Sequence, residues 1–190
     1  PKEKTYDLYA SILSESSRLE KLIGNLLLAS RINNAYPYNF ESLNFKQIIE
    51  SIIKSIEFQH PEADIHFICP NEFIQLCADK EALVSVITNL IENSIKYSAA
   101  PAFVEIRVNR MNRNVILEIS DHGFGIADAE KPKVLEQFYR TGNEETRQTK
   151  GTGLGLYIVD RIVRAHKGNI KIYDNIPTGT RIVITLPQNK

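Results

Sequence analysis

Between residues 43 and 186, the spacing of the apolar residues changes repeatedly between that of a helix and that of a strand. Helical spacing predicts helices over residues 43–59, 79–97 and 154–166, and alternation predicts strands over residues 65–69, 74–77, 104–108, 115–119, 170–172 and 182–186. Polar turns join the last four strands into two hairpins. This order predicts an α/β fold, a two-layer α/β sandwich in which helices cover one face of a mixed, largely antiparallel sheet.

A different pattern occupies residues 5–33, where apolar residues recur every seven positions at Ile12, Leu19 and Leu26. This spacing predicts one long helix with an apolar stripe. One helix cannot bury such a stripe alone, so it needs a partner helix from this chain, from a second copy or from sequence outside the chain. The alternative is that the stripe packs on the domain that follows it. Pro37 disfavours helix at the preceding residue, and we therefore place a linker at 34–39.

The predicted helix over residues 79–97 carries four polar side chains beside its apolar stripe. They lie at i, i+4, i+7 and i+8, within about 100° of arc: Asn89, Asn93, Lys96 and Tyr97. A solvated helix face accounts for the lysine but not for two asparagines, which weaken a core helix. A nucleotide site accounts for all four, because amide oxygens suit Mg²⁺, an ammonium suits phosphate and a tyrosine ring can cover a base.

Residues 121–126, Asp-His-Gly-Phe-Gly-Ile, directly follow a predicted strand. An aspartate and two glycines at a strand end often form only a turn. In a pocket, however, the carboxylate can accept a hydrogen bond from the exocyclic amine of adenine and would repel the O6 of guanine. The glycines would let the backbone approach the base closely.

Residues 151–156, Gly-Thr-Gly-Leu-Gly-Leu, open the predicted helix that ends at His166, and Gly168 is expected to cap that helix. Alternating glycines at a helix N-terminus leave N–H groups that can bind phosphates. The spacing is neither that of a dinucleotide fingerprint nor that of a P-loop. Residues 127–150 are polar and poorly periodic, which predicts a loop with one short helical piece at 134–138.

Four segments, in this order and at these separations, resemble the N, G1, F and G2 boxes of sensor histidine kinases: NLIENSIKY (89–97), DHGFGI (121–126), EQFYR (136–140) and GTGLGL (151–156). The resemblance covers about residues 40–190, and residues 7–33 resemble the second helix of that family's dimerisation and phosphotransfer stalk. It implies a Bergerat fold. Residues 1–36 would be a partial stalk helix, and residues 37–190 the catalytic ATP-binding domain.

The resemblance also assigns roles at the phosphate end of the site. It implies that Asn93 holds Mg²⁺, that Asn89 lies near the phosphates, and that Lys96 and Arg140 contact them. The catalytic residues would be Asn89, Lys96 and Arg140. The glycine-rich run would wrap the phosphates through Gly151, Thr152, Gly153, Leu154 and Gly155.

At the base end, the resemblance implies that Tyr97 stacks on adenine and that Asp121 binds its amine. Gly123, Gly125 and Ile126 would shape this pocket. Phe138 and Tyr139 would anchor a lid over about residues 127–150, which would close over the nucleotide.

The chain departs from the family pattern in two ways. His122 stands where the family usually has asparagine; the expected effect is mild, because Asp121 is the base-binding group. The histidine that accepts phosphate in the family, which is followed by an acidic residue, is not found. The four histidines are His60, His66, His122 and His166. His166 is expected in the last turn of a helix, where a histidine is commonly hydrogen-bonded within the fold.

The implied reaction is transfer of the γ-phosphoryl group of MgATP to a histidine that is not present in this chain, for relay to an aspartate of a response regulator. Two alternatives remain. One is an ATP-hydrolysing relative of the gyrase and chaperone ATPases, which have a water-activating glutamate where this chain has Asn89. The other is a nucleotide-sensing pseudokinase, against which the intact boxes count. An anti-sigma serine kinase is disfavoured by the stalk-like helix.

The implied cofactors are ATP and Mg²⁺. The implied protein partners are a response regulator receiver domain and, in the full-length protein, a second copy joined through the stalk helices. The parent would be anchored in the inner or plasma membrane of a bacterium, with this domain in the cytoplasm. Because Lys+Arg and Asp+Glu both number 23, there is no basic excess, and we expect no nucleic-acid partner.

Overall fold

The computed structural model describes residues 2–33, 36–141 and 151–188. The chain divides into two compact units, Pro1–Tyr36 and Pro37–Lys190. The division falls within the linker that Pro37 predicts. Among the helices of the described residues, none combines the length and the hydropathy that crossing a bilayer requires.

The first unit is one helix, α1 (Lys2–Asn33). The continuous helix that the seven-residue spacing predicts is therefore confirmed. Several of its large apolar side chains expose half or more of their area: Ile12, Leu13, Leu19, Ile23, Leu26 and Leu27.

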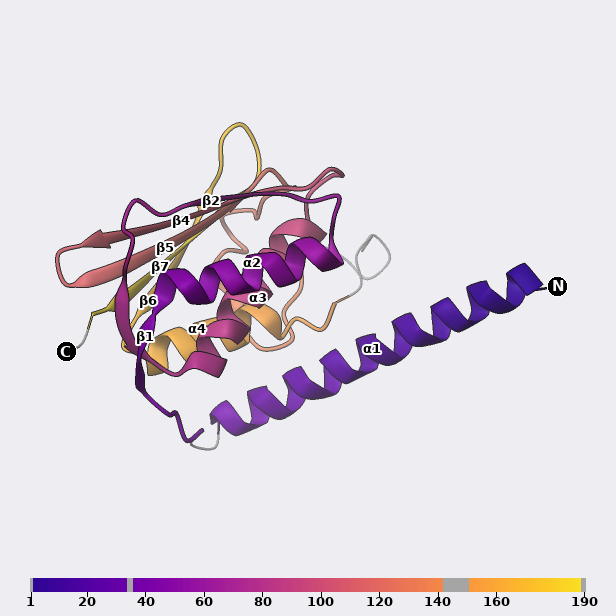
Figure 1. The fold of residues 1–190 in the computed structure, drawn as a ribbon, viewed down its shortest axis with the longest axis horizontal. Coiled ribbons are helices and arrows are strands. Elements are labelled where there is room, and N and C mark those ends of the chain that lie inside the picture. Colours follow the sequence, from indigo (N-terminus) through magenta and orange to yellow (C-terminus); the bar gives the residue numbers. More distant parts are fainter. Residues whose placement is uncertain (1, 34–35, 142–150, 189–190) are drawn as a thin grey trace. The chain divides into compact units, whose positions relative to one another are not determined.

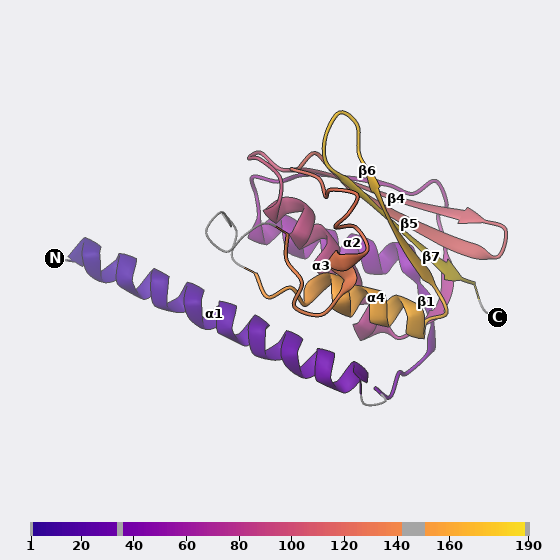
Figure 2. The same ribbon diagram turned by 180° about the vertical axis from the view of Figure 1, so that it is seen from behind.

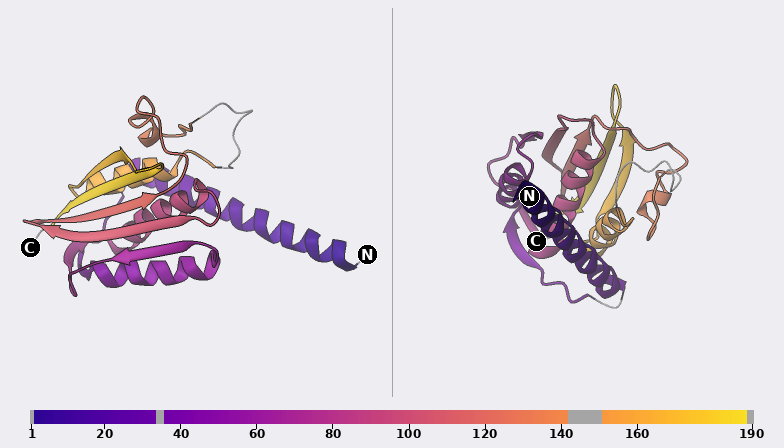
Figure 3. Two further views of the ribbon diagram at one scale, coloured as in Figure 1. Left: turned by 90° about the horizontal axis from the view of Figure 1, so that it is seen from above. Right: turned by 90° about the vertical axis from the view of Figure 1, so that its right-hand side faces the viewer.

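The second unit is built on a five-stranded sheet with the strand order β2-β4-β5-β7-β6. Its strands are β2 (Asp64–Ile68), β4 (Phe103–Met111), β5 (Asn114–Asp121), β6 (Asn169–Asp174) and β7 (Thr180–Pro187). Only β2 and β4 are parallel, whereas the other neighbours are antiparallel. The mixed, largely antiparallel sheet is therefore confirmed. The loop between β6 and β7 extends beyond the sheet (Figure 3).

Three helices cover one face of this sheet: α2 (Phe45–Gln59), α3 (Lys80–Lys96) and α4 (Gly155–Ala165) (Figures 1 and 2). Helix α3 packs against both α2 and α4 and against β4 and β5. The core lies between the two layers, where Ile87, Ile106 and Ile158 are fully buried. Each such side chain contributes about 1.5–3 kcal/mol. The predicted two-layer sandwich is confirmed.

The start of α2 differs from the prediction. Residues 43 and 44 are extended rather than helical, because β1 (Glu41–Asn44) pairs antiparallel with β3 (Gln75–Ala78) in a separate two-stranded sheet. The helix begins at Phe45, whose N–H donates to the carbonyl of Ile74 at 2.8 Å. Pairing with a distant strand overrides the local apolar spacing here.

The end of α4 corrects the expectation for Gly168. The residue in the left-handed region is Lys167, with φ of 57°. The N–H of Gly168 donates to Val163 O at 2.8 Å, as in a helix C-terminal motif. A methyl group on Gly168 would lie only 2.6 Å from Thr185 O. Glycine is therefore required at this position by the close approach of β7, not by its own backbone angles.

His166, at the C-terminal end of α4, is only 5% exposed. Its Nε2 accepts a hydrogen bond from the Asp79 N–H at 3.0 Å, so Nδ1 carries the proton and donates to Ile162 O at 2.8 Å. Burial lowers the pKa of this imidazole below 6.5, although the Ile162 carbonyl and the Asp79 charge oppose the shift. The expectation of a histidine satisfied within the fold is confirmed.

The stability of the protein is expected to fall as the pH drops below 6.5, the ordinary pKa of histidine. Because the folded-state pKa of His166 is lowered, the unfolded chain binds more protons in this range, so the contribution is complete above pH 6.5 and is lost toward the folded-state pKa. Urea unfolding at about pH 7.5 and about pH 5.5 measures the effect. His166→Gln should reduce the difference in unfolding free energy between the two pH values, while His60→Gln should retain it. A difference as large in His166→Gln as in wild type would contradict the assignment.

Candidate nucleotide-binding site

Two asparagines of α3 face the start of α4. A methyl group placed on Gly155 would lie 2.9 Å from Asn89 Oδ1 and 3.6 Å from Asn93 Nδ2. Asn89 Nδ2 donates to Ser85 O at 2.8 Å, which orients the amide with its oxygen toward Gly155. Both amides therefore lie beside the first turn of α4, where backbone N–H groups have no partner within the helix.

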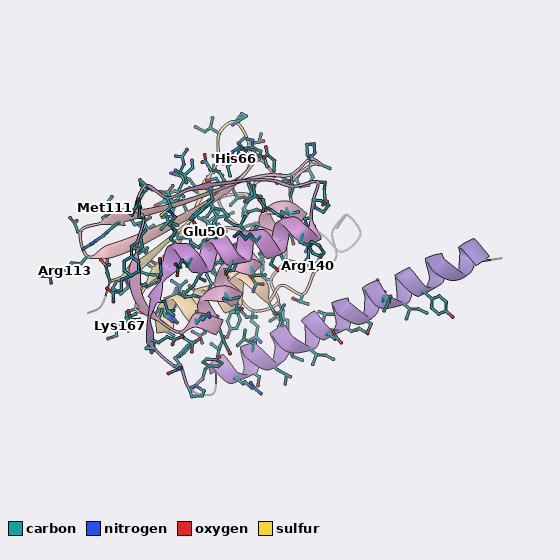
Figure 4. All side chains as sticks on the ribbon, in the orientation of Figure 1. Glu50, His66, Met111, Arg113, Arg140 and Lys167 are labelled. Atoms are coloured by element: carbon teal, nitrogen blue, oxygen red, sulfur yellow. The ribbon has the colours of Figure 1, made fainter. Side chains whose placement is uncertain are left out.

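A second group of side chains meets at Gly151. A methyl group there would lie 2.6 Å from Lys96 Nζ, 3.8 Å from Tyr97 Oη and 3.9 Å from Arg140 Nε. Lys96 Nζ also donates to Tyr97 Oη at 3.1 Å and lies 4.6 Å from the centroid of the Tyr97 ring. In Figure 4, Arg140 lies at the end of the second unit that is opposite Lys167, the residue that follows the C-terminal end of α4. Two cations beside a glycine-rich backbone form a suitable site for phosphate oxygens.

Asp121 ends β5 and is only 7% exposed. Oδ1 accepts hydrogen bonds from the N–H groups of Gly123 at 2.9 Å and Thr180 at 3.0 Å. Burial raises the pKa of this carboxyl, and the bonds from Gly123, Thr180 and the Ser94 side chain, together with the nearby His122, oppose the rise. The carboxylate is thus a fixed acceptor, held in place by three elements of the fold.

Close backbone packing fixes the position of this carboxylate. A side chain at Gly123 would collide with the carbonyl of Tyr97, and one at Gly179 would collide with the carbonyl of Asp121. The Phe124 N–H donates to Tyr97 O at 3.2 Å. These contacts hold residues 121–124 against the end of α3. The predicted base group and the predicted phosphate groups therefore share one region.

Gly125 has φ of +72°, a conformation that favours glycine. A methyl group on it would lie 3.4 Å from Gly179 O, and the next residue, Ile126, is half-buried. The predicted base-pocket residues are thus continuous with Asp121 along the chain and packed against the β6–β7 loop.

The glycine-rich run packs on the EQFYR segment. Gly153 has φ of +70°, and a methyl group on it would lie 2.6 Å from the Tyr139 carbonyl oxygen. The Phe138 N–H donates to Gly153 O at 3.0 Å. Thr152 Oγ1 accepts from the Leu154 N–H at 3.3 Å, and Leu154 is buried in the core. The middle of the run is therefore held against residues 138 and 139.

The predicted anchors of the lid behave differently from each other. The Phe138 side chain is 58% exposed, so it is the backbone of this residue that joins the glycine-rich run. Tyr139 Oη donates to Glu130 Oε1 at 3.1 Å. The short helical piece is a 3-10 turn, η1 (Lys133–Leu135). Residues 142–150 of the predicted lid lie outside the described residues.

Three residues that hold Asp121 are missed by sequence reasoning: Ser94, Gly179 and Thr180. Residues 177–179 carry only the signature of a turn, and nothing local connects them with a strand end more than fifty residues earlier. Ser94 offers a weak signal, because it lies seven residues after Ile87 on the buried side of α3. A polar residue at a core position needs a buried partner.

The four histidines are all held in other contacts. His166 uses both ring nitrogens within the fold. His122 stacks on Phe103 at 4.9 Å between ring centroids, and His66 Nε2 lies 2.9 Å from Asp64 Oδ1. His60 Nδ1 lies 3.4 Å from Glu62 Oε1. None of the four is among the groups that meet at Gly155 or at Gly151, so none is placed there to accept a phosphoryl group.

Two amides and two cations meet the glycine-rich run, and a buried carboxylate lies near the C-terminal end of α3, an arrangement expected of a nucleotide-binding site. The chain belongs to the family described as histidine kinase-, DNA gyrase B- and HSP90-like ATPases, which matches residues 78–190. The sequence is 30% identical over 179 residues to the sensor-like histidine kinase SenX3 of Mycobacterium tuberculosis and 34% identical over 176 residues to the sensor protein kinase WalK of Staphylococcus aureus. These matches cover 93% and 91% of this chain but only 43% and 42% of the relatives.

Solved structures agree with this placement. The mycobacterial sensor histidine kinase MprB gives a TM-score of 0.70 at 26% identity, over 78% of this chain and 97% of that one. The histidine kinase AdeS of Acinetobacter baumannii gives 0.77 at 26% identity, over 96% and 85%. The predicted fold and the resemblance to sensor histidine kinases are confirmed: this is the ATP-binding catalytic domain of that class. The chain spans less than half the length of the curated relatives above.

Proposed function

We propose that this chain transfers the γ-phosphoryl group of MgATP to a histidine on a stalk helix outside the chain. The convergence of the phosphate-directed groups carries the proposal. Asn89 and Asn93 lie at Gly155, while Lys96 and Arg140 lie at Gly151, so the two ends of the glycine-rich run are each lined by α3.

The proposed reaction is an in-line displacement. The unprotonated imidazole nitrogen of the acceptor forms a bond to the γ-phosphorus, the bond from that phosphorus to the β,γ-bridging oxygen breaks, and ADP leaves with the electron pair. The other ring nitrogen then releases its proton to solvent, which leaves a neutral phosphoimidazole. Lys96 and Arg140 would neutralise charge on the phosphate oxygens, and the N–H groups at the start of α4 would bind them. Asn89 would orient the phosphates. These groups act by position and charge, so no general base is needed for a neutral imidazole.

The residues fit a magnesium ion that arrives with the nucleotide. Within the described part of the chain, no three His, Cys, Asp or Glu side chains are grouped to hold a metal. Mg²⁺ commonly takes one or two protein oxygens and completes its shell with phosphate and water. Asn93 would supply such an oxygen. When bound, the ion neutralises phosphate charge.

At the base end, Asp121 would accept the adenine amine, and Tyr97 would cover the ring. The Asp121 carboxylate is buried and held by backbone N–H groups, so it cannot turn away to suit a guanine. This arrangement supports ATP rather than GTP as the nucleotide.

The proposal extends to the parent protein. The exposed stripe of α1 supports a homodimer formed through stalk helices, since apolar side chains at seven-residue spacing pack well between helices. A receiver domain of a response regulator would take the phosphoryl group from the acceptor histidine. The parent would be anchored in a bacterial membrane, with this domain in the cytoplasm.

The test supplies the acceptor in trans. The chain is incubated with γ-³²P-labelled ATP, Mg²⁺ and the histidine-bearing stalk of the parent protein. The stalk should acquire acid-labile label, and its acceptor His→Gln variant should not. Addition of a receiver domain should then remove the label from the stalk.

The same assay separates the two alternatives. An unlabelled stalk, with ATP bound but not consumed, would support the pseudokinase. Release of inorganic phosphate without stalk labelling, at a rate that does not depend on the stalk, would support a hydrolase. Either result would overturn the proposed transfer.

A further inference from the structure

Helix α4 contacts α3 at both of its own ends. At the nucleotide end, Gly155 meets Asn89. At the other end, His166 accepts the N–H of Asp79, the residue that caps α3. Ten residues separate Asp79 from Asn89, and eleven separate Gly155 from His166. At a rise of about 1.5 Å per residue, the two contacts are separated by nearly the same distance along α3 as along α4, as expected for two antiparallel helices packed side by side.

The hydrogen bond from Asp79 to His166 satisfies a buried backbone N–H, the one that precedes α3. Asp79 is 5% exposed, and its Oδ1 accepts the Ala82 N–H at 2.9 Å as a helix cap. Its own N–H precedes the helix and points to His166 Nε2. Because an unpaired buried N–H is costly, this bond resists sliding of α3 along α4. Sliding would also move Asn89 and Asn93 away from the start of α4.

A short segment, Tyr38–Phe40, encloses this bond; we call it the clasp. The Asn39 N–H donates to Asp79 Oδ2 at 2.8 Å. The rings of Tyr38 and Phe40 lie 5.4 Å and 4.9 Å from that of His166. The chain then enters β1, where Glu41 pairs with Ala78, the residue before Asp79. The clasp therefore contacts both partners of the bond and shields them from water.

We propose that His166 is a positioning residue for the nucleotide site and that the clasp holds it in place. His166 sets the position of α3 along α4, and through it the positions of Asn89 and Asn93. The inference rests on the proposed roles of these asparagines at the phosphates. Asp121 ends β5. Ser94 of α3 and Tyr97, which caps that helix, contact its region, but the backbone N–H groups of Gly123 and Thr180, which lie outside α3, both donate to its carboxylate. A shift of α3 should therefore weaken phosphate binding more than adenine binding.

Two substitutions of His166 test the positioning role. His166→Leu removes the acceptor but keeps an apolar filling, whereas the side-chain oxygen of His166→Gln can still accept the Asp79 N–H. His166→Leu should lower MgATP affinity about tenfold and adenosine affinity less than about twofold, as expected for one unpaired buried N–H. His166→Gln should restore MgATP affinity to within about threefold of wild type. Calorimetry measures MgATP binding and NMR titration measures adenosine binding, at a temperature where circular dichroism shows each variant folded.

The clasp is tested by the double variant Tyr38→Ala, Phe40→Ala. Phe40 is 47% exposed but Tyr38 is half-buried, so binding by this variant is measured at a temperature where circular dichroism shows it folded. It should lower MgATP affinity about threefold to tenfold, with adenosine affinity nearly unchanged. The matched control is Phe58→Ala, which truncates an aromatic residue of α2 that is 90% exposed and should change neither affinity.

Three results would overturn the proposal: equal loss of MgATP and adenosine binding in His166→Leu, a His166→Gln variant as weak as His166→Leu, or a double variant that binds like wild type. The two proposals fail separately. If wild type binds no MgATP, or if Asn93→Ala leaves affinity intact, the proposed function fails. If Asn93→Ala weakens MgATP binding while His166→Leu does not, only the positioning role fails.

Discussion

Asn93→Ala is expected to reduce MgATP affinity by up to about a hundredfold, because a polar contact with a charged group contributes about 1.5–3 kcal/mol. The substitution removes the amide that lies beside Asn89 and Gly155. It should not weaken the fold, because alanine is the better helix former and the position is only half-buried. Isothermal calorimetry with MgATP measures the effect, and thermal unfolding measures stability.

Asn109→Ala is the matched control for Asn93→Ala. Asn109 lies on β4 with its side chain exposed, outside both contact groups of the site. It should leave MgATP affinity at the wild-type value. The magnesium assignment gives a further signature: omission of Mg²⁺ should weaken ATP binding in wild type far more than in Asn93→Ala. Equal sensitivity of the two proteins to Mg²⁺ would remove the assignment.

Asp121→Asn is expected to lower the preference for ATP over GTP by about a hundredfold. The amide keeps an oxygen that can accept the Gly123 and Thr180 N–H groups, so the fold should persist. In that orientation the NH₂ group replaces the second carboxylate oxygen, and it would oppose the amine of adenine while donating to the O6 of guanine. Competition of ATP and GTP against a fluorescent nucleotide measures the ratio.

The pH dependence of ATP affinity is a second test of the role of Asp121. Because burial raises the pKa of this carboxyl, ATP affinity in wild type should begin to fall at a higher pH than an exposed aspartate would give, since the protonated group accepts the amine poorly. In Asp121→Asn, ATP affinity should not show this fall at low pH, which we call the acid limb. Asp64→Asn, on the exposed strand β2, should keep both the limb and the nucleotide preference. An unchanged ATP-to-GTP ratio in Asp121→Asn would place the base pocket elsewhere.

Local sequence was sufficient for the elements that bury a periodic apolar face. The helix predicted over residues 79–97 begins where expected, because the Asp79 side chain accepts the Ala82 N–H and caps it. The arc from Asn89 to Tyr97 was placed on that helix because period and residue type agree along one segment. Where long-range pairing competes with local spacing, prediction failed: residues 43 and 44 were expected in a helix but belong to β1, because their backbone bonds go to β3.

The sequence by itself determined which chemical groups the site would contain, because the boxes are short continuous segments whose residue types state their own chemistry. Only the tertiary structure decided how those groups are held. Ser94, Thr180 and Gly179 support Asp121, and His166 and residues 38–40 support the start of α3. The physical reason is that a buried donor or acceptor is satisfied by whichever group the packed layers bring to it, and that group can lie anywhere along the chain.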